Sequence, residues 1–283
     1  MSVLDDIIAG VREDLEARKQ KVSLAQLQDL IAARPPALDA WAALGGDDSP
    51  RAGLKVIAEV KRRSPSKGPL AEIADPALLA AQYADGGAAV ISVLTEQRRF
   101  GGSLADLDAV RAAVGIPVLR KDFTCDPYQI WEARAHGADL ILLIVAALTD
   151  AELAGFLALA DELGMNVLVE THTSEEVQRA VAAGARIIGV NVRNLKTLDV
   201  DRSVFGSLAG LIPAEALVVA ESGVRDADDV RHYAGHGANA VLVGEALVSH
   251  ATPGERIAEF GSAGAAAVSA AAIATAGSGH ALS

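Results

Sequence analysis

From residue 56 onward, short apolar runs of strand length alternate with amphipathic segments of helical length. The helical segments include 76–85, 104–114, 127–136, 150–163 and 175–183. Strands that alternate with helices form a parallel sheet, and eight such strands close it. The pattern therefore predicts an α/β fold, a (β/α)8 TIM barrel over residues 51–260. The eight runs begin at Val56, Ala89, Pro117, Asp139, Asn166, Ile187, Leu217 and Ala240.

A second repeat lies within this pattern. The second, fourth, sixth and eighth runs each follow a Gly-Ala pair, in which the glycine is placed to end a helix in the left-handed conformation. A two-fold alternation around eight units is typical of a barrel whose core layers are filled by alternate strands. An open doubly wound sheet is the alternative, and it would show a GxGxxG turn, which this sequence lacks. The four pairs begin at Gly87, Gly137, Gly184 and Gly237.

The two ends of the chain have different patterns. Apolar residues recur at helical spacing from Val3 to Lys21, and Ser23 is placed to cap a second helix, 24–33, which Pro35-Pro36 ends. Residues 1–50 therefore form a helical extension that is too short for a core of its own and packs on the barrel. After Glu259 the chain is rich in Ala, Ser and Gly, so we expect 261–283 to be a tail that is a frayed helix or disordered.

Composition narrows the class of partner. The formal charge of −12 argues against a nucleic-acid surface, although a few convergent cations would still bind an anionic small molecule. Cys125 is the one cysteine, which excludes an internal disulfide and favours a reducing compartment. The sequence shows no signal peptide and no run of 18 apolar residues. We expect a cytoplasmic protein, a monomer or weak oligomer that binds no membrane.

Polar residues cluster where the predicted strands end, which is the rim on which barrels build their active sites. Glu59 and Lys61 lie two residues apart on the first strand and so share a face. Lys121 lies two residues after the apolar Leu119, so the two side chains are expected on the same face of the strand. An apolar residue is expected to face the barrel interior, which makes Lys121 a better inward candidate than Arg120. Each residue alone is equally well explained as part of a structural ion pair or as a solvent-exposed residue at a strand end. Their occurrence together on one rim favours an active site. The later strands add Glu170, Asn191, Arg193, Glu221, Ser222 and Gly223.

The chemistry of this set suggests an acid–base site with an anion pocket. Ser222-Gly223 and Gly244-Glu245 follow the seventh and eighth strands, where barrels often bind phosphate through backbone N–H groups. Burial between barrel walls lowers the pKa of a lysine and raises that of a glutamate, which predicts values nearer neutrality. The six histidines show no metal-ligand spacing and are interpreted as surface or packing residues. We expect no metal and no cofactor.

Together the motifs resemble the indole-3-glycerol phosphate synthase family, over essentially Val3 to Glu259. The resemblance implies a lyase of tryptophan biosynthesis that acts on 1-(2-carboxyphenylamino)-1-deoxyribulose 5-phosphate. Ring closure, decarboxylation and dehydration give indole-3-glycerol phosphate, carbon dioxide and water. The motifs are IAEVKRRSPS from Ile57, SVLTE from Ser92, FGGS from Phe100, LRKDF from Leu119, LLIVAAL from Leu142, Glu170 after Val169, GVNVRNL from Gly189 and AESGV from Ala220.

The resemblance also implies roles for the rim residues. Lys121 is the general acid for ring closure, and Lys61 holds the substrate carboxylate and protonates the leaving hydroxyl. Glu59 and Glu170 share the work of base and charge stabilisation, in a division that stays open. The other residues bind substrate: Asn191 and Ser222 the ribulose hydroxyls; Ser64, Gly223, Gly244 and the backbone of Glu245 the phosphate; Phe100, Phe123 and Leu195 the anthranilate ring; and Arg193 and Glu221 elsewhere in the site.

Two alternatives remain at this point. Phosphoribosylanthranilate isomerase uses the same barrel and a related ligand, but that family has a cysteine base on the first strand, where this chain has Glu59 and Lys61. A catalytically silent phosphate-binding barrel that serves as an assembly partner is the other alternative. It would need no lysine and glutamate facing each other across the mouth.

Overall fold

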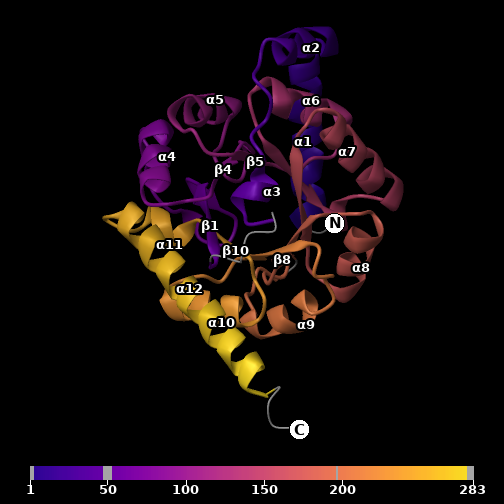
Figure 1. Cartoon of the computed structure of the whole chain (residues 1–283). Helices are drawn as coiled ribbons and strands as arrows, with labels where there is room; N and C mark the ends of the chain where they lie inside the picture. The colour runs from indigo at the N-terminus through magenta and orange to yellow at the C-terminus, as the bar shows by residue number, and fades with distance from the viewer. Residues whose placement is uncertain (1–2, 47–52, 196, 279–283) are drawn as a thin grey trace.

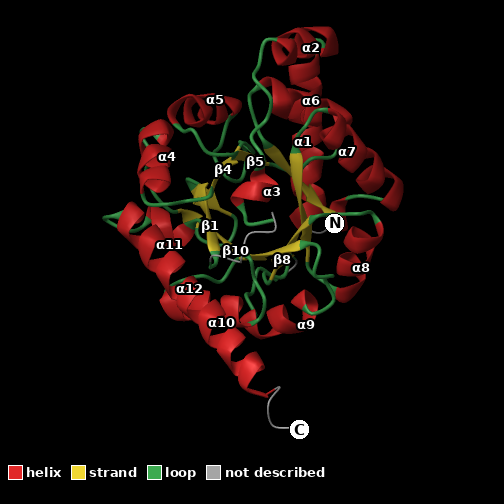
Figure 2. Cartoon of the chain, viewed as in Figure 1, coloured by secondary structure: helices red, strands yellow, loops and turns green. Residues whose placement is uncertain are grey.

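The computed structural model describes residues 3–46, 53–195 and 197–278, with 270–278 described by their backbone alone. Eight parallel strands close into a barrel in the order β1-β10-β9-β8-β7-β6-β5-β4. Helices surround this ring of strands (Figure 2). The predicted (β/α)8 barrel is confirmed, and its strands begin within one residue of the predicted positions. They are β1 (Lys55–Val60), β4 (Val90–Leu94), β5 (Val118–Lys121), β6 (Leu140–Ile144), β7 (Asn166–Thr171), β8 (Ile187–Asn191), β9 (Leu217–Glu221) and β10 (Ala240–Val243).

Alternation along the strands separates two apolar cores. One face of each strand packs against the surrounding helices, as Val56, Ala58 and Val60 of β1 do. The other face fills the lower half of the barrel interior, where Ile57 meets residues such as Leu168. Higher in the barrel, the inward positions become polar, since Glu59 follows Ile57 at the inward parity. The apolar floor therefore supports a polar layer at the carboxyl ends of the strands.

The helices of the barrel begin where the sequence places a capping side chain. Asp75, Ser103 and Thr149 each accept a hydrogen bond from the backbone N–H three residues later. Several predicted helices end one residue earlier in the structure, because the last residue is the C-cap. The helices after the extension are α4 (Pro76–Asp85), α5 (Leu104–Ala113), α6 (Pro127–Ala135), α7 (Asp150–Glu162), α8 (Ser174–Ala182), α9 (Phe205–Ala209), α10 (Ala227–Gly235), α11 (Glu245–Val248) and α12 (Pro253–Ser278), with 3-10 turns η1 (Val145–Ala147) and η2 (Arg202–Val204).

The four predicted left-handed glycines are confirmed. Gly87, Gly137, Gly184 and Gly237 have φ between +82° and +92° and lead into β4, β6, β8 and β10. Gly164 before β7 also has a positive φ of +71°, so the device is not confined to alternate strands. A left-handed residue reverses the chain within two positions, which directs each following strand back into the sheet.

The N-terminal extension runs along the barrel from one end to the other. Helix α1 (Val3–Lys19) pairs with the loops after β4 and β5, through Arg98 to Asp14 at 2.7 Å and through Lys19 to Asp126 at 2.7 Å. Helix α2 (Leu24–Ala32) packs on α6, and α3 (Ala40–Ala43), which the pattern did not predict, lies inside the ring of strands in Figure 1. Ala40 N donates to Asn166 Oδ1 at the start of β7, at 2.7 Å. The extension thus caps the amino-terminal end of the barrel and reaches its mouth.

The C-terminal segment is helical, one of the two expected alternatives. Helix α12 is continuous through residue 260 to Ser278 and lies beside α10 (Figure 1). Ala263 is buried in the outer core, and Ala267 and Val268 pack against that core. Alanine has the highest helix propensity, so this composition extends a helix that already has a surface to pack on. The expected tail is therefore helical as far as Ser278, and residues 279–283 lie outside the described part.

A two-stranded hairpin, β2 (Arg63–Ser64) and β3 (Gly68–Pro69), follows β1 at the mouth. Among the described residues, none of the helices is long and apolar enough to cross a membrane.

Candidate active site

A cavity of about 530 Å³ opens at the carboxyl ends of the barrel strands. The polar layer above the apolar floor forms its base, and the loops after the strands form its walls. Lys121 faces into this cavity, whereas Arg120 points outward to Glu132 of α6 at 2.9 Å, as parity predicts. Every site residue expected from the sequence lines the cavity: Glu59, Lys61, Ser64, Phe100, Lys121, Phe123, Glu170, Asn191, Arg193, Leu195, Glu221, Ser222, Gly223, Gly244 and Glu245.

Glu59 and Lys61 form the first charged pair of the site. The Lys61 ammonium contacts Glu59 Oε1, and the glutamate side chain is only 3% exposed. The bare backbone of Gly244, just after β10, faces this pair. A Cβ on Gly244 would lie 2.5 Å from Glu59 Oε1 and 3.1 Å from Lys61 Nζ. A glycine is therefore required at position 244 to leave space for Glu59 and Lys61, whether or not it also contacts a ligand.

Lys121 is the centre of the second charged group. Its Nζ lies 2.9 Å from Glu170 Oε2 and 3.3 Å from Glu221 Oε2, and all three side chains are at most 14% exposed. Gly189 on β8 leaves space for Glu221, because a Cβ there would overlap Glu221 Oε1. One ammonium is thus shared by two carboxylates at the middle of the cavity floor.

These contacts shift the pKa values of Lys121, Glu170 and Glu221 in different ways. Burial lowers the pKa of Lys121, but the carboxylates of Glu170, Glu221 and Glu59 outweigh it and hold the pKa above its usual range. Burial raises the pKa of Glu170, yet Lys121 and His172 keep it well below its usual range. Burial raises the pKa of Glu221 to about 8, with Glu170 adding to the rise and Lys121 opposing it.

The prediction that burial brings the pKa values of the rim lysines and glutamates towards neutrality is therefore wrong for Lys121 and Glu170. The raised carboxyl pKa belongs instead to Glu221, which was expected only to bind substrate. The sequence pattern shows that charged residues share a rim but not how many carboxylates meet one ammonium. Two carboxylate contacts within 3.3 Å give a Coulomb attraction larger than the cost of desolvating the cation.

Neutral donors and acceptors connect this group to the strand ends beside it. Asn191 Nδ2 donates to Glu170 Oε1 at 3.1 Å, and Ser222 Oγ donates to Asn191 Oδ1 at 2.9 Å. The Arg193 N–H donates to the same Oδ1 at 3.0 Å, while its guanidinium donates to Leu198 O at 2.8 Å. Asn191 is thereby fixed with its amide towards Glu170.

The loops after β9 and β10 form a polar pole of the cavity. Ser222 and Gly223 both have positive φ, +69° and +79°, so the chain turns sharply at the rim. The first helical bonds of α11 are donated by Leu247 and Val248 to Gly244 O, which leaves the earlier N–H groups at its start directed outward. Across the mouth, Lys67 from the hairpin loop pairs with Glu245. Backbone donors and a nearby ammonium suit an anionic group.

Another part of the cavity wall is apolar. Phe100 and Phe123 pack with ring centroids 5.9 Å apart, and Leu195 also lines the cavity. Helix α1 adds Val3, Leu4 and Ile7, which the sequence analysis did not include in the site. Their helical spacing indicated an apolar stripe but not the surface that it covers. A flat, partly aromatic ligand fits between these walls.

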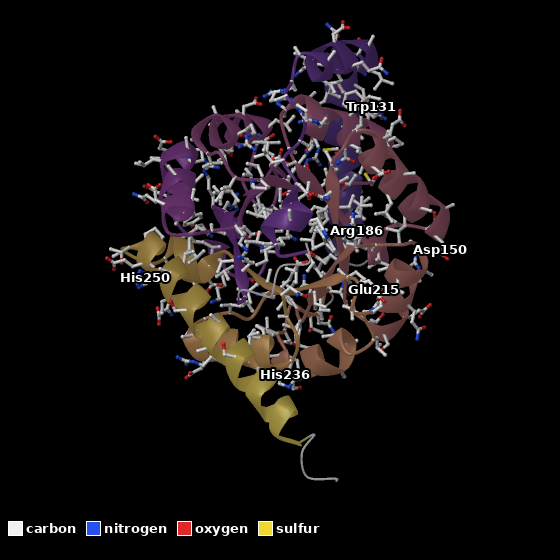
Figure 3. All side chains as sticks on the ribbon, viewed as in Figure 1. Trp131, Asp150, Arg186, Glu215, His236 and His250 are labelled. Carbon is white, nitrogen blue, oxygen red and sulfur yellow. The ribbon has the colours of Figure 1, made fainter. Side chains whose placement is uncertain are left out.

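One titratable residue beside the site was also missed. His172 was interpreted as a surface or packing residue, but its Nε2 lies 3.3 Å from Glu170 Oε1. The signal was its position, because His172 follows the inward-facing Glu170 by two residues, just beyond the end of β7. Figure 3 shows that His236 and His250, by contrast, lie at the periphery of the barrel, where both are exposed.

Comparison with solved structures supports the barrel. The structure of 3-hexulose-6-phosphate synthase from Salmonella typhimurium superposes with a TM-score of 0.61 at 16% identity, covering 77% of this chain and 100% of that one. Thiamine phosphate pyrophosphorylase from Pyrococcus furiosus gives a TM-score of 0.59 at 15% identity, covering 77% of this chain and 98% of that one. At these identities the likeness concerns the fold alone.

Sequence comparison is far more specific. A family model described as indole-3-glycerol phosphate synthase matches residues 4–260. The indole-3-glycerol phosphate synthase of Arthrobacter sp. (strain FB24) is 78% identical over 270 residues, covering 95% of this chain and 99% of that protein. The protein of the same name from Micrococcus luteus is 64% identical, covering 92% of this chain and 97% of that protein. With its barrel, its Lys121 cluster and these relatives, the chain belongs to the indole-3-glycerol phosphate synthase family.

Proposed function

We propose that this chain converts 1-(2-carboxyphenylamino)-1-deoxyribulose 5-phosphate into indole-3-glycerol phosphate, carbon dioxide and water, as the name of its relatives indicates. The observation that carries the proposal is the Lys121 ammonium, held 2.9 Å and 3.3 Å from two carboxylates at the cavity floor. The same cavity has a polar pole and an apolar wall. The substrate has corresponding parts, with a phosphate, a reacting ketone and an aromatic ring.

In the proposed ring closure, the ring carbon that bears the carboxylate attacks the ketone carbon. The carbonyl electron pair moves to oxygen, and Lys121 gives that oxygen its proton. The carboxylates keep the ammonium protonated at neutral pH, and an alkoxide is basic enough to accept the proton. We assign this step to Lys121, which Glu170 and Glu221 hold at the cavity floor, and we assign the later dehydration to Lys61, which is paired with Glu59.

Decarboxylation and dehydration follow at the same carbons. Loss of carbon dioxide returns its electron pair to the ring, and the new hydroxyl group leaves as water when an acid protonates it. Lys61 supplies that proton while Glu59 holds its ammonium in place, and Glu170 takes the proton from the carbon next to the nitrogen. Glu170 suits the role of base because its neighbours keep it ionised.

The remaining residues hold the substrate at its ends. Gly223, Gly244, Glu245 and Ser64 would bind the phosphate, chiefly through backbone N–H groups. Arg193 and Lys61 offer positive charge to the substrate carboxylate, and Asn191 and Ser222 offer hydrogen bonds to the hydroxyls. We infer that the reaction needs no cofactor, because each step is a proton transfer or a bond rearrangement within one molecule. We also infer a cytoplasmic location, from the single cysteine.

The test is turnover of the purified chain, followed by indole fluorescence and by release of carbon dioxide. One equivalent of carbon dioxide per indole product is the expected result. The substrate analogue that lacks the phosphate should show a KM at least 100-fold higher, equivalent to about 2.7 kcal/mol of lost binding. No product from folded protein would refute the activity and favour a silent barrel. An unchanged KM for the analogue would refute the phosphate site alone.

A further inference from the structure

His172 is a buried titratable residue that the reaction scheme does not use. We propose that it is a positioning residue that acts through Glu170 and determines which of the two carboxylates beside Lys121 stays ionised. The inference rests on the role of base proposed for Glu170. Its basis is the placement of the imidazole between the carboxylates of Glu170 and Glu176.

Each nitrogen of the imidazole lies next to a carboxylate. Nε2 lies 3.3 Å from Glu170 Oε1, although the angle is too bent for a full hydrogen bond. Nδ1 lies 3.1 Å from Glu176 Oε2, in the first turn of α8, and the backbone N–H of His172 donates to that same oxygen at 2.7 Å. The His172 side chain is 9% exposed. A histidine that served only to pack would not direct each ring nitrogen at a separate carboxylate.

Two carboxylates hold this ring as an imidazolium. Burial lowers the pKa of His172, but Glu170 and Glu176 outweigh it and raise the pKa to about 9. A line of alternating charge follows, from Lys121 through Glu170 and His172 to Glu176. Each member favours the charged form of its neighbours, so the line is stable at neutral pH.

The His172 imidazolium contacts Glu170 but not Glu221, the other carboxylate beside Lys121. Glu170 has Lys121 on one side, His172 on the other and the Asn191 amide at 3.1 Å. Glu221 has Lys121 at 3.3 Å, and its Oε1 finds no hydrogen-bond partner among the described residues. Because two buried carboxylates so close together resist double ionisation, one proton is shared unequally between them. His172 places that proton on Glu221.

The charged groups around this pair come from several strands. Lys121 approaches from β5, Glu221 from β9 and Glu59 from β1, and His172 and Glu176 lie on the β7–α8 side. Of these, His172 is the one that contacts Glu170 without contacting Lys121 or, in the described cavity lining, the substrate space. Its removal therefore changes the charge next to Glu170 and leaves the cavity groups in place.

The experiment replaces the ring by a neutral donor of similar reach, His172→Gln. Carbon-13 NMR of labelled glutamate carboxyls should show the pKa of Glu170 rising by about one unit, a tenfold change in proton affinity. The acid limb of the kcat/KM profile should move up by the same amount, with kcat at the optimum changed less than fivefold. The matched control is His250→Gln, which changes an exposed histidine. It should leave the pKa of Glu170 and the acid limb of the kcat/KM profile unchanged.

A second variant keeps the test decisive if His172→Gln does not fold. Glu176→Gln leaves the imidazole in place but removes its outer carboxylate, so the pKa of His172 should fall and that of Glu170 should rise by a smaller amount. A wild-type His172 that titrates below pH 7, or a Glu170 titration that is the same in both variants and wild type, would overturn the inference. The NMR titrations need no turnover. A protein that fails to form indole product would therefore refute the proposed function while the His172 coupling is judged separately.

Discussion

Replacing Lys121 with methionine removes the charge at the centre of the site with little change in volume. The wild-type ammonium lies 2.9 Å from Glu170 and 3.3 Å from Glu221. If Lys121 is the proton donor for ring closure, kcat should fall by 10²- to 10⁴-fold, about 3 to 5 kcal/mol in activation free energy. Binding of a non-reacting substrate analogue should change by no more than about tenfold, since the phosphate and ring contacts remain.

The same change affects stability in a pH-dependent way. Each lost contact represents a gross attraction on the order of 5 kcal/mol at an effective dielectric constant near 20. Breaking such a buried group costs a net of about 3 to 5 kcal/mol, because uncompensated charge remains. Without Lys121, the carboxyl pKa values in the folded protein lie above the unfolded value of about 4.3. The folded variant then binds more protons than the unfolded chain, so its stability falls as pH rises above that value.

The assay combines kcat, analogue affinity by calorimetry and denaturant unfolding at pH 5, 7 and 9. The stability deficit of Lys121→Met should be smallest at pH 5 and largest at pH 9. Lys21→Met, which changes an exposed lysine, should leave all three measurements unchanged. A kcat within tenfold of wild type would refute the acid role, and a deficit independent of pH would refute the shared-charge description of the cluster.

Two further predictions concern the seat of Glu221 and the helical extension. Gly189→Ala should lower kcat at least tenfold and cost about 1 to 3 kcal/mol of stability, because its methyl group displaces Glu221 from Lys121. The control is Gly155→Ala on α7, where the added methyl group meets open space, and it should be neutral or slightly stabilising. Equal kcat values for Gly189→Ala and wild type would show that the position of Glu221 does not depend on Gly189. Deleting residues 1–20 removes the α1 residues at the cavity but keeps α3 in the barrel, so kcat/KM should fall more than tenfold with the chain still folded. If the truncated chain keeps a normal kcat/KM below its melting temperature, α1 only packs on the barrel and does not contribute to the active site.

The sequence determined the barrel and the membership of its rim. Local rules sufficed for the elements, because capping residues such as Asp75 start helices and left-handed glycines such as Gly87 end them. Strand parity then placed Glu59, Lys121 and Glu170 on the inward face, since side chains alternate with a period of two. Both rules act over a few neighbouring residues, and a sequence records such relations directly.

Only the tertiary structure decided how these residues act on one another. The sequence predicted a lowered lysine pKa, but the closed barrel brings Glu170 and Glu221 to Lys121 from separate strands, and their attraction outweighs desolvation. The fold also directs the His172 side chain towards Glu170, and it sets Gly189 against Glu221. The contacts between strands join positions 32 to 100 residues apart, and the His172–Glu170 contact depends on the direction that the His172 side chain takes. Proton affinity depends on distances of a few ångströms between such groups, and those distances are set by the register and curvature of the whole sheet.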